Sequence, residues 1–223
     1  MIKAIIFDFD GTLTKRLENV YLLYNDFFKK YFFDLDEIEY EAVIQDLMYY
    51  ECNGTIVLRD RMIQFRKKYS KYINDEVVET FVDYYRNNMY KYCNLKPETL
   101  DVLNKLKGKY KLGILSNGDS KTQHDKVDKF GLEKYFDKVL ISGDVDIEKP
   151  DTRIYRIMVD ALGVQANECL FIGDTYSTDI LGAIKSNMIP IWMKMDREKP
   201  TSYKGYMINN LEEVFEILKK ENN

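Results

Sequence analysis

The chain has 223 residues, of which 45% are hydrophobic and 31% charged, and its formal net charge is −4. This composition excludes a mainly disordered chain and supplies enough apolar material for a folded core. The slightly acidic balance argues against a nucleic-acid-binding protein, and no apolar run has the length of a membrane span.

Residues 2–7 are predicted to form an opening strand, and the pattern of the chain after it predicts helices. Between Thr12 and Lys96 there is no proline and a single glycine, and apolar residues such as Leu23 and Phe27 recur at helical spacing. We therefore predict an all-helical domain at residues 15–92, with a break between helix pairs at Asn53-Gly54.

From Pro97 onward, short apolar runs alternate with helical patterns. The predicted strands are residues 111–115, 138–141, 169–172 and 189–193, and the predicted helices are residues 97–108, 120–131, 150–163 and 179–185, with a last helix that Asn210 caps. Pro190 has no N–H to donate, so we expect the last strand to lie near a sheet edge. Alternation of this kind predicts an α/β fold with a doubly wound parallel sheet, formed by residues 1–14 and 93–223.

Four polar clusters directly follow predicted strands. They are Asp8-Phe9-Asp10-Gly11-Thr12, Ser116-Asn117-Gly118, Glu148-Lys149-Pro150 and the segment from Gly173 to Asp179. The carboxyl ends of parallel strands meet at one edge of a sheet, where ligands bind. A cluster of carboxylates there is costly unless a cation offsets it, and oxygen ligands favour Mg²⁺. Lysine, hydroxyl and backbone N–H groups bind phosphate, so the set predicts phosphoryl transfer.

Each motif alone has a simpler interpretation as a turn, a helix cap or a solvated helix start. The functional interpretation is favoured because all four occur in order, each after a strand. Cys52, Cys93 and Cys169 are too few and too widely spaced for a zinc site or a disulfide framework, and we expect buried or half-buried thiols. His124 is the sole histidine and has no nucleophile motif near it.

Taken together, the four motifs resemble those of the haloacid dehalogenase-like (HAD) hydrolase superfamily, and the resemblance covers essentially the whole chain. It implies a Rossmann-like core with a helical cap between the first and second motifs. Two sets of residues are also similar to the N-acylneuraminate-9-phosphatase and pyrimidine nucleotidase branches: Leu115–Asp119 with Thr122-Gln123, and Gly173-Asp174-Thr175 with Thr178-Asp179-Ile180.

The resemblance implies a role for each carboxylate. Asp8 would be the nucleophile and a Mg²⁺ ligand. Asp10 would protonate the leaving oxygen and then activate water, while its backbone carbonyl binds the metal. Asp174 would bind Mg²⁺ directly, and Asp179 would act from outside the metal ligands through water or Lys149.

The same resemblance implies that Ser116 and the Asn117 amide hold the phosphoryl oxygens and that Lys149 neutralises the phosphate. Asp10 favours phosphate chemistry over dehalogenation. We therefore expect a Mg²⁺-dependent phosphomonoester hydrolase that acts through an aspartyl-phosphate on a small nucleotide or sugar phosphate. The alternatives are a phosphomutase and a catalytically silent binding protein. We expect a cytoplasmic monomer or weak homodimer without nucleic-acid or membrane partners.

The helical domain is expected to close over the site, to exclude water and to recognise the leaving group of the substrate. Candidate contacts are Asn53-Gly54-Thr55 and either Arg59 or Arg61, whereas most of the aromatic side chains are expected only to pack the helices. Lys15-Arg16 stand where many relatives carry an acidic residue. Tyr176 lies inside the fourth motif. Its side chain is expected either to line the cleft at the active site or to pack against other side chains.

Overall fold

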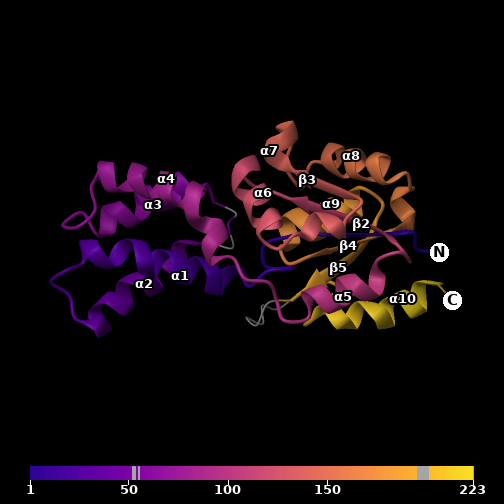
Figure 1. The fold of residues 1–223 in the computed structure, drawn as a ribbon, viewed down its shortest axis with the longest axis horizontal. Coiled ribbons are helices and arrows are strands. Elements are labelled where there is room, and N and C mark those ends of the chain that lie inside the picture. Colours follow the sequence, from indigo (N-terminus) through magenta and orange to yellow (C-terminus); the bar gives the residue numbers. More distant parts are fainter. Residues whose placement is uncertain (52–53, 55, 195–200, 223) are drawn as a thin grey trace. The chain divides into compact units, whose positions relative to one another are not determined.

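The computed structural model describes residues 1–51, 54, 56–194 and 201–222 (Figure 1). The chain divides into two compact units, which we call the α/β unit (Met1–Lys15 with Leu95–Asn223) and the helical unit (Arg16–Asn94). Cys52, Asn53 and Thr55, which the sequence analysis singled out, lie outside the described residues. Among the described residues, none of the helices combines the length and apolar character that a transmembrane segment requires.

The α/β unit is built on a parallel sheet, as predicted. Within the described residues, six strands pair in the order β3-β2-β1-β4-β5-β6. They are β1 (Ala4–Phe7), β2 (Lys111–Ser116), β3 (Lys138–Ile141), β4 (Cys169–Gly173), β5 (Ile189–Met193) and β6 (Tyr206–Ile208). Every residue of β1 and β4 is buried, which parallel strands require because helices cover both faces of such a sheet.

The helices of this unit lie on both sides of the sheet (Figure 1). They are α5 (Thr99–Leu106), α6 (Ser120–Lys129), α7 (Ser142–Val145), α8 (Thr152–Leu162), α9 (Leu181–Lys185) and α10 (Val214–Asn222). On one face, Tyr155 and Met158 of α8 share a core with Ile6 and Phe171 of the strands. On the other face, α5 and α10 lie side by side.

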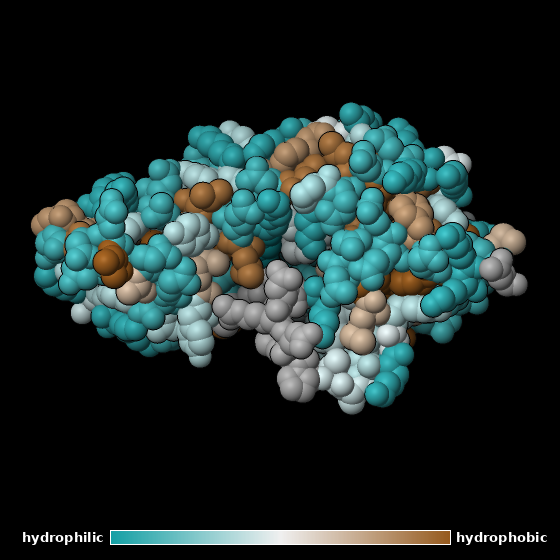
Figure 2. Space-filling view, turned by 90° about the horizontal axis from the view of Figure 1, so that it is seen from below, coloured by the Kyte–Doolittle hydropathy of each residue, from teal (hydrophilic) through white to brown (hydrophobic). Residues whose placement is uncertain are grey.

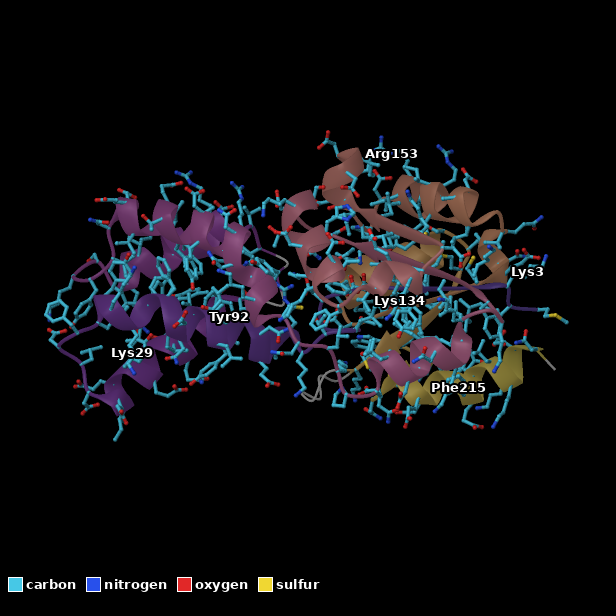
Figure 3. All side chains as sticks on the ribbon, viewed as in Figure 1. Lys3, Lys29, Tyr92, Lys134, Arg153 and Phe215 are labelled. Carbon is cyan, nitrogen blue, oxygen red and sulfur yellow. The ribbon has the colours of Figure 1, made fainter. Side chains whose placement is uncertain are left out.

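The contact between α5 and α10 is partly electrostatic. Lys105 Nζ of α5 lies 5.7 Å from the centre of the Phe215 ring of α10, which is a cation–π distance. Lys3 and Arg153 form ion pairs at the surface, with Glu168 and Asp151, and their side chains are 59% and 63% exposed (Figure 3). The surface seen in Figure 2 is mainly hydrophilic, and hydrophobic side chains reach it in separate patches.

Side-chain caps determine where several helices begin. The Asp119 carboxylate accepts a 3.0 Å hydrogen bond from the Thr122 N–H, so the cap of α6 is Asp119, one residue before the predicted Ser120. The predicted cap at Asn210 is confirmed, since its side chain accepts from the Glu212 N–H at 3.0 Å.

The strand that contains Pro190 lies near a sheet edge, as expected, although it is not the edge strand itself. β5 pairs with β4 on one side and with β6 on the other, so β6 occupies the edge. Pairing with β6 starts at Ile191, opposite Tyr206, and Pro190 has its ladder partner Phe171 on the other side only. The proline therefore lies just before the doubly paired part of β5, where its missing N–H removes no bond to β6.

The helical unit confirms the predicted helical block. Its main helices are α1 (Arg16–Phe28), α2 (Glu37–Glu51), α3 (Leu58–Lys68) and α4 (Asp75–Tyr92). Their core is largely aromatic: the Phe28 ring of α1 lies 5.4 Å from Phe65 of α3 and 4.8 Å from Phe81 of α4, measured between ring centres. Most of the aromatic side chains that stand out in the sequence therefore pack helices together.

We expect Phe28→Ala to destabilise the helical unit by about 3–5 kcal/mol, because the substitution leaves a cavity among buried rings. Urea unfolding followed by far-ultraviolet circular dichroism measures this loss. Phe33→Ala is the matched control, since Phe33 is 84% exposed and its removal should change stability by no more than about 0.5 kcal/mol. Equal effects of the two substitutions would contradict the aromatic core.

Candidate active site

The first and fourth predicted motifs of the site lie beside each other because β1 and β4 are neighbours in the sheet. From β1 the chain adds β2 and β3 on one side and β4 to β6 on the other, so the boundary between β1 and β4 is the topological switch point of the sheet. Doubly wound sheets bind ligands at this point. Asp8 follows β1 and Asp174 follows β4, and the Asp8 N–H donates to the Ile172 carbonyl at 2.8 Å. Chain topology alone therefore brings the two carboxylates together.

Lys149 joins two of the predicted carboxylates. Its ammonium nitrogen lies 2.6 Å from Asp8 Oδ1 and 2.8 Å from Asp179 Oδ1, and the three side chains are buried. Burial lowers the pKa of Lys149, but the charges of Asp179 and Asp8 more than offset this, and the net shift is upward. Burial raises the pKa of Asp8 to about 6, although Lys149 opposes the shift. Lys149 therefore carries its charge at neutral pH.

Three carboxylates of the site lie within reach of one cation. Asp8, Asp174 and Asp179 each offer an oxygen, and these atoms lie within 4.8 Å of one another. The three carboxylates are buried close together, which is costly, and a divalent cation would offset their negative charge. An all-oxygen donor set suits Mg²⁺ better than a softer metal ion. The residues present therefore fit a magnesium ion.

The Asp8–Thr12 loop approaches Asp174 closely, and a glycine makes this possible. Gly11 has φ +91°, a conformation that L side chains rarely adopt, and a Cβ placed on it would lie 2.3 Å from Asp174 Oδ2. A side chain at this position would displace the carboxylate. The Asp174 main chain is held from the other side, where the Trp192 indole N–H donates to its carbonyl at 2.9 Å.

Asp179 is held by a π-helical turn, Tyr176–Ile180, that directly precedes α9. One of its oxygens accepts from Lys149 Nζ and the other accepts from the Thr175 N–H at 2.9 Å. With both oxygens engaged by protein donors, Asp179 has the geometry of a residue that orients Lys149. Tyr176, in the same turn, packs 5.2 Å from the Trp192 ring and is 41% exposed.

Ser116 and Asn117 end β2 beside this cluster. The Asn117 side chain makes two hydrogen bonds to the main chain of Lys149, accepting from its N–H at 2.8 Å and donating to its carbonyl at 3.0 Å. Its side-chain amide therefore positions the lysine. The Ser116 hydroxyl is buried and accepts from Gln123 Nε2 at 2.7 Å.

The Asp10 side chain has partners that were not predicted from the sequence. Lys126 Nζ lies 2.7 Å from Asp10 Oδ2, and Gln123 Nε2 lies 3.0 Å from the same oxygen. The spacing of Gln123 and Lys126, three residues apart on a predicted helix after Ser116, is the signal that relates them, because such residues share a helix face.

The arginines proposed as substrate contacts have partners within the helical unit. Arg59 pairs with Glu79 at 2.7 Å in solvent. Arg61 is buried and forms an ion pair with Glu51, which also accepts from the Tyr24 hydroxyl at 2.8 Å. Arg16 pairs with the same glutamate. Each of these ion pairs joins two helices of the unit.

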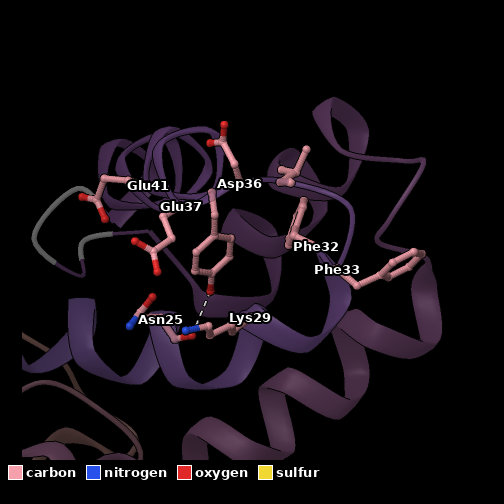
Figure 4. A pocket seen from close by; sticks show the side chains of 9 residues that line it. Asn25, Lys29, Phe32, Phe33, Asp36, Glu37 and Glu41 are labelled. Atoms are coloured by element: carbon pink, nitrogen blue, oxygen red, sulfur yellow. Dashed lines mark hydrogen bonds between the residues drawn. The ribbon is translucent and has the colours of Figure 1, made fainter.

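The helical unit also contains a pocket of about 420 Å³ near the end of α1 and the start of α2 (Figure 4). Its lining includes the carboxylates of Asp36, Glu37 and Glu41 and the ammonium of Lys29. The carboxylates outnumber the ammonium in this lining, which disfavours an anionic phosphate there.

Comparison with known proteins agrees with this geometry. The model of the haloacid dehalogenase-like hydrolase family matches residues 5–193. The pyrimidine 5'-nucleotidase YjjG of Escherichia coli (strain K12) is 29% identical over 227 residues, which are 97% of each chain. The N-acylneuraminate-9-phosphatase of Rattus norvegicus is 27% identical over 149 residues, 65% of this chain and 60% of its own.

Solved structures share the fold. The HAD-hydrolase YfnB from Bacillus subtilis, in a magnesium-bound crystal structure, has a TM-score of 0.79 and 22% identity, and the match covers 97% of this chain and 98% of that one. The resemblance inferred from the four motifs is thus confirmed. The chain belongs to the haloacid dehalogenase-like hydrolase family and is an enzyme of its phosphatase type.

Proposed function

We propose that this phosphatase is a Mg²⁺-dependent phosphomonoester hydrolase that forms an aspartyl-phosphate on Asp8. The observation that carries the proposal is the buried meeting of Asp8, Asp174 and Lys149 at the carboxyl edge of the sheet. Asp8 supplies a carboxylate nucleophile, and Lys149 supplies a positive charge for the phosphoryl group.

Two steps account for hydrolysis. In the first, a carboxylate oxygen of Asp8 bonds to phosphorus, the P–O ester bond breaks, and the leaving oxygen takes a proton from the Asp10 carboxyl group. In the second, a water molecule attacks phosphorus and gives a proton to Asp10, while the bond between phosphorus and Asp8 breaks. Inorganic phosphate leaves, and both aspartates return to their starting states.

The phosphoryl oxygens would be held by donors from three segments. These are the Ser116 hydroxyl, the main-chain N–H of Asn117 and the Lys149 ammonium. Mg²⁺ would be held by Asp8, Asp174 and the Asp10 carbonyl, and would offset negative charge on the phosphate. Asp179 keeps the lysine in place through its 2.8 Å hydrogen bond.

For substrate, we propose a small phosphorylated metabolite of the nucleotide or sugar-phosphate class. Support comes from the names of the relatives, one a pyrimidine 5'-nucleotidase and the other an N-acylneuraminate-9-phosphatase. We assign the helical unit the role of a cap that selects the leaving group. Its connections support this, because the chain leaves the α/β unit directly after the loop of Asp8 and Asp10 and returns where Leu95 pairs with Thr14.

Asp8→Asn should reduce kcat/KM for 4-nitrophenyl phosphate by at least about 10³-fold, because a carboxamide cannot form the aspartyl-phosphate. Asp101→Asn, an exposed position on α5, is the matched control and should retain wild-type activity. Inactivity of the wild type at high enzyme concentration with Mg²⁺ would instead favour the silent binding protein. A requirement for a sugar bisphosphate would favour the mutase.

Removal of divalent ions with EDTA should abolish turnover, and added Mg²⁺ should restore it. Asp174→Asn should weaken Mg²⁺ binding by about 10- to 100-fold or more, because it removes one of the carboxylates that hold the ion. Calorimetric titration with Mg²⁺ measures this independently of activity. Asp160→Asn, an exposed position on α8, should bind Mg²⁺ as the wild type does. Unchanged affinity in the Asp174 variant would refute the assigned metal site.

Gly11→Ala should lose Mg²⁺ binding, because the added Cβ would lie 2.3 Å from Asp174 Oδ2. Gly108→Ala is a matched control, since Gly108 also has a positive φ, +79°, but nothing lies within 4 Å of its Cβ position. Both substitutions should cost about 1–2 kcal/mol in unfolding free energy from backbone strain. Calorimetry should separate them, and equal Mg²⁺ affinities would rule out the close approach to Asp174.

A further inference from the structure

Helix α6 presents two buried polar side chains to the Asp10 carboxylate. Lys126 Nζ donates to Asp10 Oδ2 at 2.7 Å and to Gln123 Oε1 at 2.6 Å. Gln123 Nε2 donates to the same Asp10 oxygen at 3.0 Å. The three side chains thus form a closed ring of hydrogen bonds that fixes one carboxylate oxygen from two directions.

The same ring reaches the proposed phosphate-binding hydroxyl. Gln123 Nε2 also donates to Ser116 Oγ at 2.7 Å, so one amide group contacts both Ser116 and Asp10. A phosphate ester has its transferring oxygens and its leaving oxygen on the same phosphorus atom. Ser116 is proposed to bind the transferring oxygens and Asp10 to protonate the leaving oxygen. The distance between these two side chains, which Gln123 sets, therefore affects the reaction directly.

The local sequence builds this arrangement into α6. Gln123 and Lys126 are three residues apart and share the helix face that meets the carboxyl ends of the strands. Asp119 fixes the start of the helix, and Gly118 provides the space for Gln123, because a Cβ on Gly118 would lie 3.0 Å from Gln123 Cγ. With φ +147°, Gly118 also has a backbone conformation that L side chains rarely adopt.

The burial of Lys126 is the unusual feature. Lys126 is 1% exposed and Gln123 is 3% exposed, whereas Lys121 and Lys129 on the same helix are exposed to solvent. Moving an ammonium out of water is costly, and excellent geometry with a carboxylate is needed to offset the cost. A lysine that served only the solubility of the helix would remain in solvent like its neighbours.

We propose that Lys126 and Gln123 are positioning residues that hold the Asp10 carboxyl group at the leaving oxygen of the phosphate ester. This inference rests on the proposed function, in which Asp10 exchanges the proton. Neither Lys126 nor Gln123 touches the reacting atoms. Their effect is transmitted through the ring, which leaves Asp10 a single orientation in which to deliver the proton.

The test compares two substrates that differ in how much they need that proton. Phenyl phosphate has a more basic leaving oxygen than 4-nitrophenyl phosphate and the same ring. The value of kcat/KM covers phosphoryl transfer to Asp8 and departure of the phenol. The ratio of the two values, measured on one preparation, is independent of the folded fraction, so partial misfolding of a variant does not obscure the result.

In Lys126→Met and in Gln123→Met, we expect the ratio of phenyl to 4-nitrophenyl kcat/KM to fall by about tenfold or more, because a positioned acid contributes on the order of 10²–10⁴-fold when the leaving group needs a proton. Lys129→Met, an exposed position on α6, should keep the wild-type ratio. The Gln123 variant should also raise KM for both substrates, since Ser116 loses its donor.

The possible failures are distinguishable. If the wild type does not hydrolyse 4-nitrophenyl phosphate with Mg²⁺, the proposed function fails and this inference falls with it. If the wild type is active and both variants keep its ratio, only the positioning role of Lys126 and Gln123 is overturned. A uniform loss on both substrates would likewise overturn it, because a merely structural contribution lowers both rates equally.

Discussion

The ammonium of Lys149 is the group on which the rest of the candidate site depends. It contacts Asp8, which follows β1, and Asp179, which lies in the turn after β4, while its main chain is fixed by Asn117 at the end of β2. Lys149 thus links the segments that follow three strands, β1, β2 and β4. Removing the charge would leave two carboxylates buried without their shared cation, which is far more costly than the net stabilisation that an intact pair provides.

This dependence explains which site residues could be predicted from the sequence. Asp8 and Asp174 come immediately after buried apolar strands, so the end of the strand determines where each carboxylate lies. Lys149 was predicted from the Glu148-Lys149-Pro150 motif, although α7 separates it from the end of β3. Residue type, order and distance from a strand end were sufficient for Asp8 and Asp174, because a parallel sheet aligns its carboxyl ends at one edge.

The positions that could not be predicted depend on side-chain direction. Lys126 belongs to a helix rich in lysine, where the sequence pattern cannot distinguish a buried ammonium from a solvated one. The sequence places Asn117 directly after a predicted strand. The partner of its side-chain amide depends on the path of the loop that carries Lys149, which the sequence does not determine. β6 has only three residues, Tyr206–Ile208, too few to establish an alternating pattern, so the true edge of the sheet was missed.

The chain crosses between its two units at neighbouring points. Thr14 and Leu95 form an antiparallel bridge, and the Lys96 N–H donates to the Leu13 carbonyl at 2.9 Å, so departure and return lie side by side within the α/β unit. An insertion whose ends meet in this way interrupts no strand of the sheet. Because both crossings lie at one place on the α/β unit, a change in the length of the inserted segment need not disturb the sheet or the carboxylates at its edge.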